Sequence, residues 1–486
     1  MSTRRRLNSL KYCCVQNIAK NFETCWFKPF EDQFGSTGRL MHVIGPFDDI
    51  TSDLNQYLLD VLVKEKLLKT KHLQLLITYR LLELDLSQAS GYINNDLIVN
   101  TIADRCHKLT KLNLSFCNKV SSRALENAVC QLPSIQILIL KNTKCDDKVL
   151  TAISQYSSDL RHLDVTRCKI TDRGLTFLCS NTENLPCPKL QTLRIRDCDI
   201  YKPSLSVNCI VTFLLQRSNM FDLDFNKLHL VLSAIHKINN SPHIVSSNLQ
   251  YPRIQCLDFG TEDIVSADIE LVCKYCPNIT AAVLNPVLCD EQINILNSST
   301  HLRHIEIVSD THSEVSITFE GGILPLLSCV GQHLQVLLLF ELTDVCLYSI
   351  GRLCPQLKNL NLMVSTLQNN KSQFTDNTVC FSKLQSFKCF LTGDNDMLPE
   401  DSLSVVLKNA DELQVLSLNN IQFLTTEELG HYLNHNVKPN IEQIEITKCD
   451  KIAGSIFHHL LTVAHCLTVL TLHVCQNVTR DDYSRL

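Results

Sequence analysis

The residues of this sequence best suited to chemistry are its 24 cysteines. Thiolates bind zinc where C-x-x-C pairs recur at suitable spacing, and they form disulfides in short secreted chains. One C-x-x-C pair, Cys273 and Cys276 in "CKYCPNI", has no second pair at zinc-finger spacing. It lies at the expected end of a helix, ahead of a strand, where a buried cysteine is structural. We therefore expect no metal site and no cofactor.

Motifs for catalysis are missing too. The sequence contains no glycine-rich phosphate loop, no H-E-x-x-H zinc motif and no G-x-S-x-G nucleophile motif. His, Cys, Asp and Ser are abundant, so triads could be assembled at will. We expect a non-catalytic protein.

The composition is that of an ordinary globular chain. Of 486 residues, 45% are hydrophobic and 20% are charged, and the formal net charge of −5 predicts no basic surface for nucleic acid. No apolar run approaches the roughly 18 residues that span a membrane, and "MSTRRRL" lacks the apolar stretch of a secretory signal. We expect a cytoplasmic or nuclear protein, or both, whose cysteines are reduced and mostly buried.

One pattern, L-x-x-L-x-L, recurs along most of the chain at a mean period of about 28 residues. Its fifteen starts are Leu81, Leu109, Ile135, Leu160, Leu190, Met220, Ile254, Ile279, Leu302, Leu334, Leu357, Leu384, Leu413, Ile441 and Leu467. The alternation in L-x-L predicts a short parallel strand, and the residues behind it predict a turn and a helix. No unit could bury its apolar side alone, so the units must stack.

These units predict an α/β leucine-rich-repeat solenoid over residues 81–486, a horseshoe of about fifteen strand–helix repeats with its strands on the concave side. The phrases "LRHLDVTRCKITDRGLTFLC" and "CPQLKNLNL" resemble the cysteine-containing leucine-rich-repeat class. That resemblance implies a protein-binding role, because the class is common in substrate receptors of ubiquitin ligases, including the F-box type.

Residues 1–80 are expected to form a helical N-terminal region. Helices over 54–68 and 70–79 would cap the first repeat, whereas any C-terminal cap is expected to be minimal. The long step between the starts at Met220 and Ile254 holds "INNSPHIVSSN", which predicts a projecting loop near 238–248.

The first predicted helix, residues 9–22, stands apart from the repeats. Its apolar residues Leu10, Cys14, Ile18 and Phe22 recur every four positions and form a slowly drifting stripe. With Ser9, the segment "SLKYCCVQNI" fits S-L-x-x-x-C-x-x-x-I, which resembles the Elongin BC-box of cullin-RING ligase receptors. The resemblance implies that Leu10 inserts into Elongin C beside Cys14 and Ile18, and that Elongin B accompanies it.

Two alternatives for this helix stay open. It could fold back as a cap on the horseshoe, or it could bind an F-box-like or other adaptor. A similar match, "SLSVNCIVTF" from Ser204 to Phe213, lies inside a repeat and is expected to face the core. Cullin-selecting segments would surround Pro29 and Pro46, but neither matches cleanly, and we find no F-box.

Substrate binding is expected on the concave face, where the residues flanking the second and third leucines point. Apolar residues there suggest a binding patch, and the candidates are Val336, Leu338, Phe340, Met363 and Phe390. The alternative is that the loop over 309–325 folds over them as ordinary core. Nearer the N-terminus the same face carries an acidic run that suits either a basic degron or simple solvation, and that Arg194 and Arg196 interrupt: Glu83, Asp85, Asp164, Asp222, Asp224 and Asp258.

The sequence therefore predicts a non-catalytic substrate-recognition subunit of a cullin-RING ubiquitin ligase. Elongin C and Elongin B would be recruited by the N-terminal helix, and an unknown protein substrate would be held by the repeats. The alternatives are an F-box-like receptor that uses an SCF adaptor, and a protein-binding scaffold with no ligase link.

Overall fold

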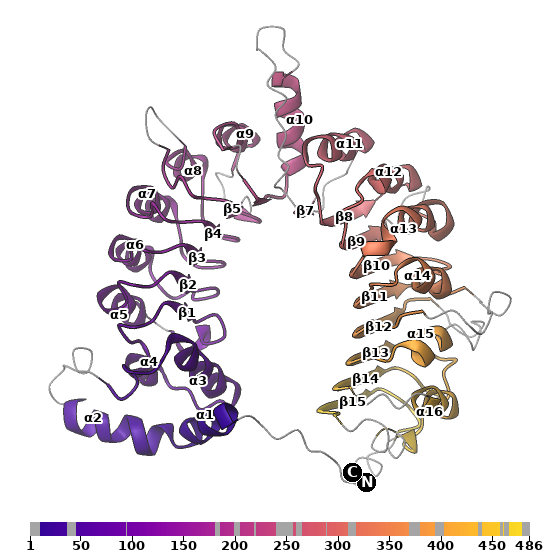
Figure 1. Cartoon of the computed structure of the whole chain (residues 1–486), viewed down its shortest axis with the longest axis horizontal. Helices are drawn as coiled ribbons and strands as arrows, with labels where there is room; N and C mark the ends of the chain where they lie inside the picture. Colours follow the sequence, from indigo (N-terminus) through magenta and orange to yellow (C-terminus); the bar gives the residue numbers. More distant parts are fainter. Residues whose placement is uncertain are drawn as a thin grey trace. The chain divides into compact units, whose positions relative to one another are not determined.

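The computed structural model divides the chain into two compact units, residues 1–226 and 227–486. It describes residues 10–35, 45–93, 95–179, 185–198, 205–217, 220–239, 256–258, 265–287, 289–309, 317–368, 380–393, 403–435, 440–456, 460 and 466–478. In each unit, helices lie along one side of a parallel sheet and leave its other face open (Figure 1).

Within its described residues, unit 1 has four N-terminal helices followed by six short strands that alternate with helices. The N-terminal helices are α1 (Leu10–Lys20), α2 (Lys28–Phe34), α3 (Ser52–Lys64) and α4 (Thr70–Leu76), and a π-helix over Phe22–Phe27 joins α1 to α2. The strands are β1 (Glu83–Asp85), β2 (Lys111–Asn113), β3 (Ile137–Ile139), β4 (His162–Asp164), β5 (Thr192–Arg194) and β6 (Asp222–Asp224). The later helices are α5 (Leu97–Arg105), α6 (Ser122–Gln131), α7 (Asp147–Tyr156), α8 (Asp172–Thr176) and α9 (Val207–Leu215).

Unit 2 has nine strands in the described part of the chain, and most are longer. They are β7 (Cys256–Asp258), β8 (Ala281–Val287), β9 (His304–Ser309), β10 (Val336–Leu342), β11 (Asn359–Val364), β12 (Ser386–Leu391), β13 (Val415–Asn419), β14 (Gln443–Thr447) and β15 (Val469–His473). Its helices are α10 (Leu228–Asn239), α11 (Ser266–Tyr275), α12 (Asp290–Ile295), α13 (Leu324–Val330), α14 (Leu347–Leu353), α15 (Ser404–Asn409) and α16 (Thr426–His435).

The strands confirm the predicted repeat. Each begins two residues after a predicted start, and the strands of each sheet pair in sequence order. The leucines of the L-x-L pattern face the helices: Leu84, Leu112 and Leu138, partners on three neighbouring strands, are all buried. Each fully buried leucine contributes roughly 2 kcal/mol, so stacking stabilises repeats that could not fold alone. The fold is an α/β leucine-rich-repeat solenoid.

Helix α3 caps the first repeat, as predicted. Its side chains form hydrogen bonds with the backbone groups along the open edge of β1. The hydroxyl of Ser52 accepts hydrogen bonds from the N–H groups of Leu82 and Glu83 and donates to the Glu83 carbonyl, at 3.1–3.2 Å. The Gln56 amide accepts from the Asp85 N–H at 2.8 Å and donates to its carbonyl at 2.9 Å. An unpaired strand edge would otherwise leave polar groups without partners.

Aspartates bridge consecutive repeats on the helical side. The Asp147 carboxylate, in the first turn of α7, accepts hydrogen bonds from the N–H of Thr171 at 2.9 Å and from its hydroxyl at 2.6 Å. Thr171 in turn caps α8. The pairs Asp96–Ser121 and Asp290–Thr318 repeat this arrangement. A charged acceptor thus fixes the start of the next helix.

Two predicted segments differ from the structure or fall outside its described part. Most of the predicted loop at 238–248 lies outside the described residues, and α10 continues to Asn239. The second N-terminal helix ends at Leu76 rather than at residue 79, because Ile77 turns extended.

We expect Asp147→Ala to destabilise unit 1 by about 2 kcal/mol, because two hydrogen bonds to a charged acceptor are lost and the Thr171 N–H loses its partner. The urea concentration at the midpoint of unfolding measures this effect. Asp104→Ala is the control, since Asp104 is exposed on helix α5, two repeats before α7. Equal midpoints for the two variants would contradict the bridging role.

Candidate functional site

Helix α1 leaves one side of its apolar stripe open. Leu10 is 80% exposed, Cys14 is exposed, Ile18 is half-buried and Phe22 is 1% exposed. Residues four apart on a helix are rotated by about 40°, so the stripe turns from solvent toward the protein along its length. Ser9, the first residue of the predicted motif, lies outside the described residues.

The other side of α1 attaches it to the protein. Val15 and Ala19 are buried, and α1 lies beside α3. The ammonium of Lys11 lies over the ring of Tyr57 on α3, 5.4 Å from its centroid. The predicted stripe was wrong at Phe22: the helix ends at Lys20, and Phe22 belongs to the attached side, where its ring stacks on Phe47.

A buried histidine fastens the segment that follows α1. His72 on α4 is 1% exposed, and its Nε2 lies 2.6 Å from a Glu23 carboxylate oxygen. Its Nδ1 accepts from the Lys69 N–H at 3.2 Å, which places the imidazole proton on Nε2. The ring centroids of Phe22 and Phe27 each lie 4.9 Å from that of the imidazole. The neutral histidine therefore combines hydrogen bonds through its nitrogens with apolar contacts to two aromatic rings.

The second match to the motif has a different fate. Leu205, Ile210 and Phe213 are buried in and beside α9. The expectation that this copy faces the core is confirmed at these positions. Location therefore separates two segments of similar pattern: the leucine of α1, Leu10, is exposed, whereas Leu205 is buried.

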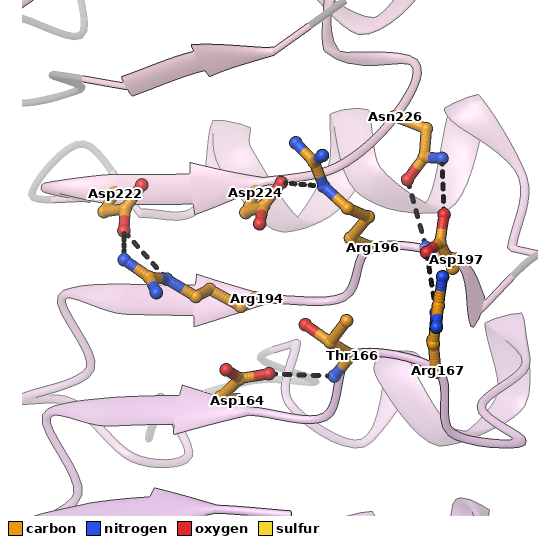
Figure 2. Close-up of polar contacts among 9 residues, drawn as sticks. All are labelled: Asp164, Thr166, Arg167, Arg194, Arg196, Asp197, Asp222, Asp224 and Asn226. Atoms are coloured by element: carbon orange, nitrogen blue, oxygen red, sulfur yellow. Dashed lines mark hydrogen bonds and ion pairs between the residues drawn. The ribbon is translucent and has the colours of Figure 1, made fainter. Parts of the chain in front are cut away.

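The open face of unit 1 is not the acidic surface that the run of carboxylates suggested (Figure 2). Arg194 donates to Asp222 at 3.0 Å, and Arg196 donates to Asp224 at 2.9 Å. Although partial burial opposes the charge, the hydrogen bond with Asp222 raises the pKa of Arg194 above its usual value. At the other end of the sheet, Lys111 pairs with Glu83 at 3.3 Å.

The remaining acids of that run accept hydrogen bonds from neutral groups or have side chains outside the described residues. Asp85 accepts a hydrogen bond from Asn113 at 2.9 Å, and Asp164 accepts one from the Thr166 N–H at 2.9 Å. The side chain of Asp258 lies outside the described residues. The two arginines that were expected to interrupt the run therefore neutralise Asp222 and Asp224, whereas the hydrogen bonds to Asp85 and Asp164 come from neutral groups and leave those carboxylates charged.

The five apolar candidates for substrate binding all lie on the open face of unit 2. They are half-buried rather than exposed: Val336, Leu338, Phe340, Met363 and Phe390. Met363 and Phe390 follow Phe340 on successive strands, so the three form one row. The sequence reasoning missed Val308, which pairs with Phe340 from β9 and extends the row.

The predicted alternative, a loop over 309–325 that covers these residues, is only partly described. Residues 317–325 form a π-helix, Phe319–Ile323, and the start of α13, on the helical side of unit 2 beside α12. Residues 310–316 lie outside the described residues. The described part therefore does not cover the apolar candidates.

Among the described residues, no group of three His, Cys, Asp or Glu side chains is placed to hold a metal. Burial raises the pKa of Cys276, at the end of α11, to about 12. The Cys273 thiol lies 3.6 Å from the Ser299 hydroxyl, and burial raises its pKa as well. Buried neutral thiols pack as small apolar groups with weak donors. Within the same residues, no helix has the length and apolar character to cross a membrane.

Comparisons with known proteins agree with the repeat fold. A family model described as "Leucine Rich repeat" matches residues 105–126 and 156–179. F-box/LRR-repeat protein 4 of Bos taurus is 31% identical over 119 residues, which cover 24% of this chain and 18% of that protein. Putative F-box/LRR-repeat protein 9 of Arabidopsis thaliana is 28% identical over 176 residues, covering 29% of this chain and 70% of that protein.

The chain thus spans less than a fifth of the bovine relative. Among solved structures, a chain of the yeast Rad7 and Elc1 complex is 17% identical, with a TM-score of 0.44 over 98% of this chain and 96% of that one. A TM-score of that size is too low to carry an inference about partners.

Acid is expected to loosen the segment from α1 to α2. Burial lowers the pKa of His72, although Glu23 beside it acts in the opposite direction. Because the folded pKa lies below the usual value of about 6.5, stabilisation by neutral His72 is complete above about pH 6.5 and is lost as the pH falls toward the lowered pKa. Amide exchange of residues 10–35, corrected for intrinsic rates, should be greater at about pH 5.5 than at about pH 7.5.

His72→Gln should remove most of that pH difference. Lys69 and His72 lower the pKa of Glu23, so the contribution of Glu23 to stability changes only below its usual value of about 4.5. A pH difference that persists in the His72→Gln variant would assign the effect to another group.

Proposed function

We propose that this protein is a non-catalytic substrate receptor of a cullin-RING ubiquitin ligase, with α1 as its docking helix for Elongin C and, through it, Elongin B. The main support for the proposal is that one side of α1 is buried against the protein and the other is exposed. Val15 and Ala19 attach the helix, whereas Leu10 is left 80% exposed beside the exposed Cys14. An exposed leucine at the free end of an anchored helix suits insertion into a partner's groove.

The way in which α3 caps the first repeat also supports a docking role for α1. The edge of β1 is already satisfied by Ser52 and Gln56 of α3, so α1 is not needed to close the sheet. Its remaining apolar side therefore serves no structural purpose in the described part of the chain. This reduces the case for α1 as a repeat cap, which was the main alternative.

In the proposed assembly the repeats hold a protein substrate, and the recruited conjugating enzyme supplies the chemistry. Catalysis would arise from proximity, because the receptor raises the effective concentration of substrate lysines near the enzyme. The protein would act in the cytoplasm or the nucleus, where such ligases work.

A second candidate is a receptor that reaches an SCF-type ligase through its own adaptor. Two relatives whose names include F-box favour it. Affinity purification of the full chain from cells, followed by mass spectrometry, separates the two. Recovery of Elongins supports the first proposal, recovery of the SCF adaptor supports the second, and recovery of neither leaves a scaffold that only binds proteins.

Leu10→Ser should weaken Elongin C binding about 30-fold, since burying a leucine in a pocket contributes roughly 2 kcal/mol. Its unfolding midpoint should not change, because Leu10 is exposed in the free protein. Leu82→Ser, at a leucine that is 50% exposed ahead of β1, is the matched control and should bind normally. Val15→Ser should instead lower stability. Unchanged binding in Leu10→Ser would refute the docking role.

The Cys14 thiol provides an independent test. Exposed in the free protein, it should react with a maleimide, and Elongin C should protect it at least about tenfold, because the proposed interface buries it. Mass spectrometry of the modified peptides measures both rates. Cys329, exposed on α13 of unit 2, is the internal control and should react equally with and without Elongin C. Equal reactivity of Cys14 in both states would place the adaptor elsewhere.

A further inference from the structure

Four apolar side chains form a continuous row on the open face of unit 2, one from each of β9, β10, β11 and β12. Phe340 pairs with Val308 on one side and with Met363 on the other, and Met363 pairs with Phe390. All four are half-buried. We call these residues the apolar row.

The apolar row lies outside the core of unit 2. The neighbouring inward residues Leu339 and Leu362 are completely buried and fill the core between strands and helices. The outward positions lie on the opposite face of the sheet, where the same row continues with polar residues, Asn419 on β13 and Thr447 on β14. An apolar side chain at four successive outward positions is therefore a feature of the surface.

Two opposite charges bracket a second row that lies beside the first. Glu306, Leu338, Asn361 and Lys388 are partners across the same four strands, and we call them the charged row. Neither Glu306 nor Lys388 forms an ion pair among the described residues. Three strand spacings of about 4.8 Å place the two charges about 14 Å apart.

Polar atoms at the margins of the two rows lack partners. Asn419 Oδ1, next to Phe390, and His304 Nε2, next to Val336, are buried without a hydrogen bond in the described structure. Buried polar atoms normally find a partner.

We propose that the two rows bind an extended segment of a partner protein that runs across β9 to β12. Alternate side chains of an extended chain point to opposite sides, so those at i, i+2 and i+4 would lie over the charged row and those at i+1 and i+3 over the apolar row. Residues i and i+4 are separated by about 13 Å, which agrees with the separation of Glu306 and Lys388.

The chemistry of the segment follows from this fit. A cationic side chain lies over Glu306, an anionic side chain four residues away lies over Lys388, and two apolar side chains between them lie over the apolar row. That such a segment is the recognition sequence of a ubiquitination substrate rests on the proposed function, but its binding to unit 2 does not.

A library of random 12-residue peptides displayed on phage, selected on the full-length chain, tests the proposal. Selected peptides should carry two apolar residues bracketed by opposite charges four positions apart. A Phe340→Ser/Phe390→Ser variant, which alters only outward side chains, should bind them at least tenfold more weakly while keeping a single cooperative unfolding transition in urea. Peptides that bind this variant equally well, or whose apolar residues recur at helical spacing, would overturn the proposal.

Charge exchange gives the sharper test. Glu306→Lys combined with Lys388→Glu should weaken a selected peptide about tenfold, and exchanging the two charges of the peptide should restore its affinity. Glu445→Lys, further along the charged row on β14, is the matched control and should change the affinity less than twofold. Failure of the exchanged peptide to restore affinity would exclude the predicted orientation of charges.

The test of peptide binding to unit 2 is independent of the test of Elongin binding. Peptide affinity is measured without Elongins, and the Leu10→Ser variant should keep it in full. Loss of Elongin binding with intact peptide binding would therefore refute only the proposed function. Normal Elongin binding with no selected peptide would refute only the inference about unit 2.

Discussion

The strand at the end of a stack of repeats exposes backbone N–H and C=O groups that need hydrogen-bond partners. In unit 1 the exposed edge of β1 is closed by two side chains of α3, the Ser52 hydroxyl and the Gln56 amide. Behind that edge, each leucine of the L-x-L pattern is covered by its neighbours, and each bridging aspartate fixes the start of the next helix. The closure has a second consequence, because it leaves α1 outside the stack.

Helix α1 is attached to unit 1 through Val15 and Ala19, while Leu10 and Cys14 stay exposed. A four-residue spacing drifts by about 40° at each step, so one stripe is anchored at its C-terminal end and free at its N-terminal end. The buried His72 holds the following segment through Glu23, between two aromatic rings. An anchored helix with a free leucine has lost most of its conformational entropy before any partner arrives, and this favours docking.

The open faces of the two sheets show how little the repeat fold constrains outward residues. In unit 1 they include charged residues, and those on β5 and β6 pair with one another. In unit 2 they include an apolar row between polar ends. Because the core uses only the inward residues, the outward ones are available for recognition. Two surfaces of different chemistry can thus be built on the same repeat.

The period, the order of the strands and their starting residues were readable from the sequence, because each repeat buries its own leucines against an identical neighbour and the pattern is local. The helix that carries Leu10, Cys14 and Ile18 could also be located, since a helical pattern lies within a few turns of chain. The structure was needed to show that Phe22 faces the protein, because packing on α3 and the turn at Asn21 decide where the stripe ends.

Contacts between repeats were decided by tertiary structure alone. Val308 was missed beside Phe340, and Arg194 and Arg196 were taken as interruptions rather than as partners of Asp222 and Asp224. In each case the two residues are about 30 positions apart in sequence, and only the register of parallel strands brings them together. A sequence pattern determines what each repeat buries, whereas the alignment of neighbouring repeats determines what each surface displays.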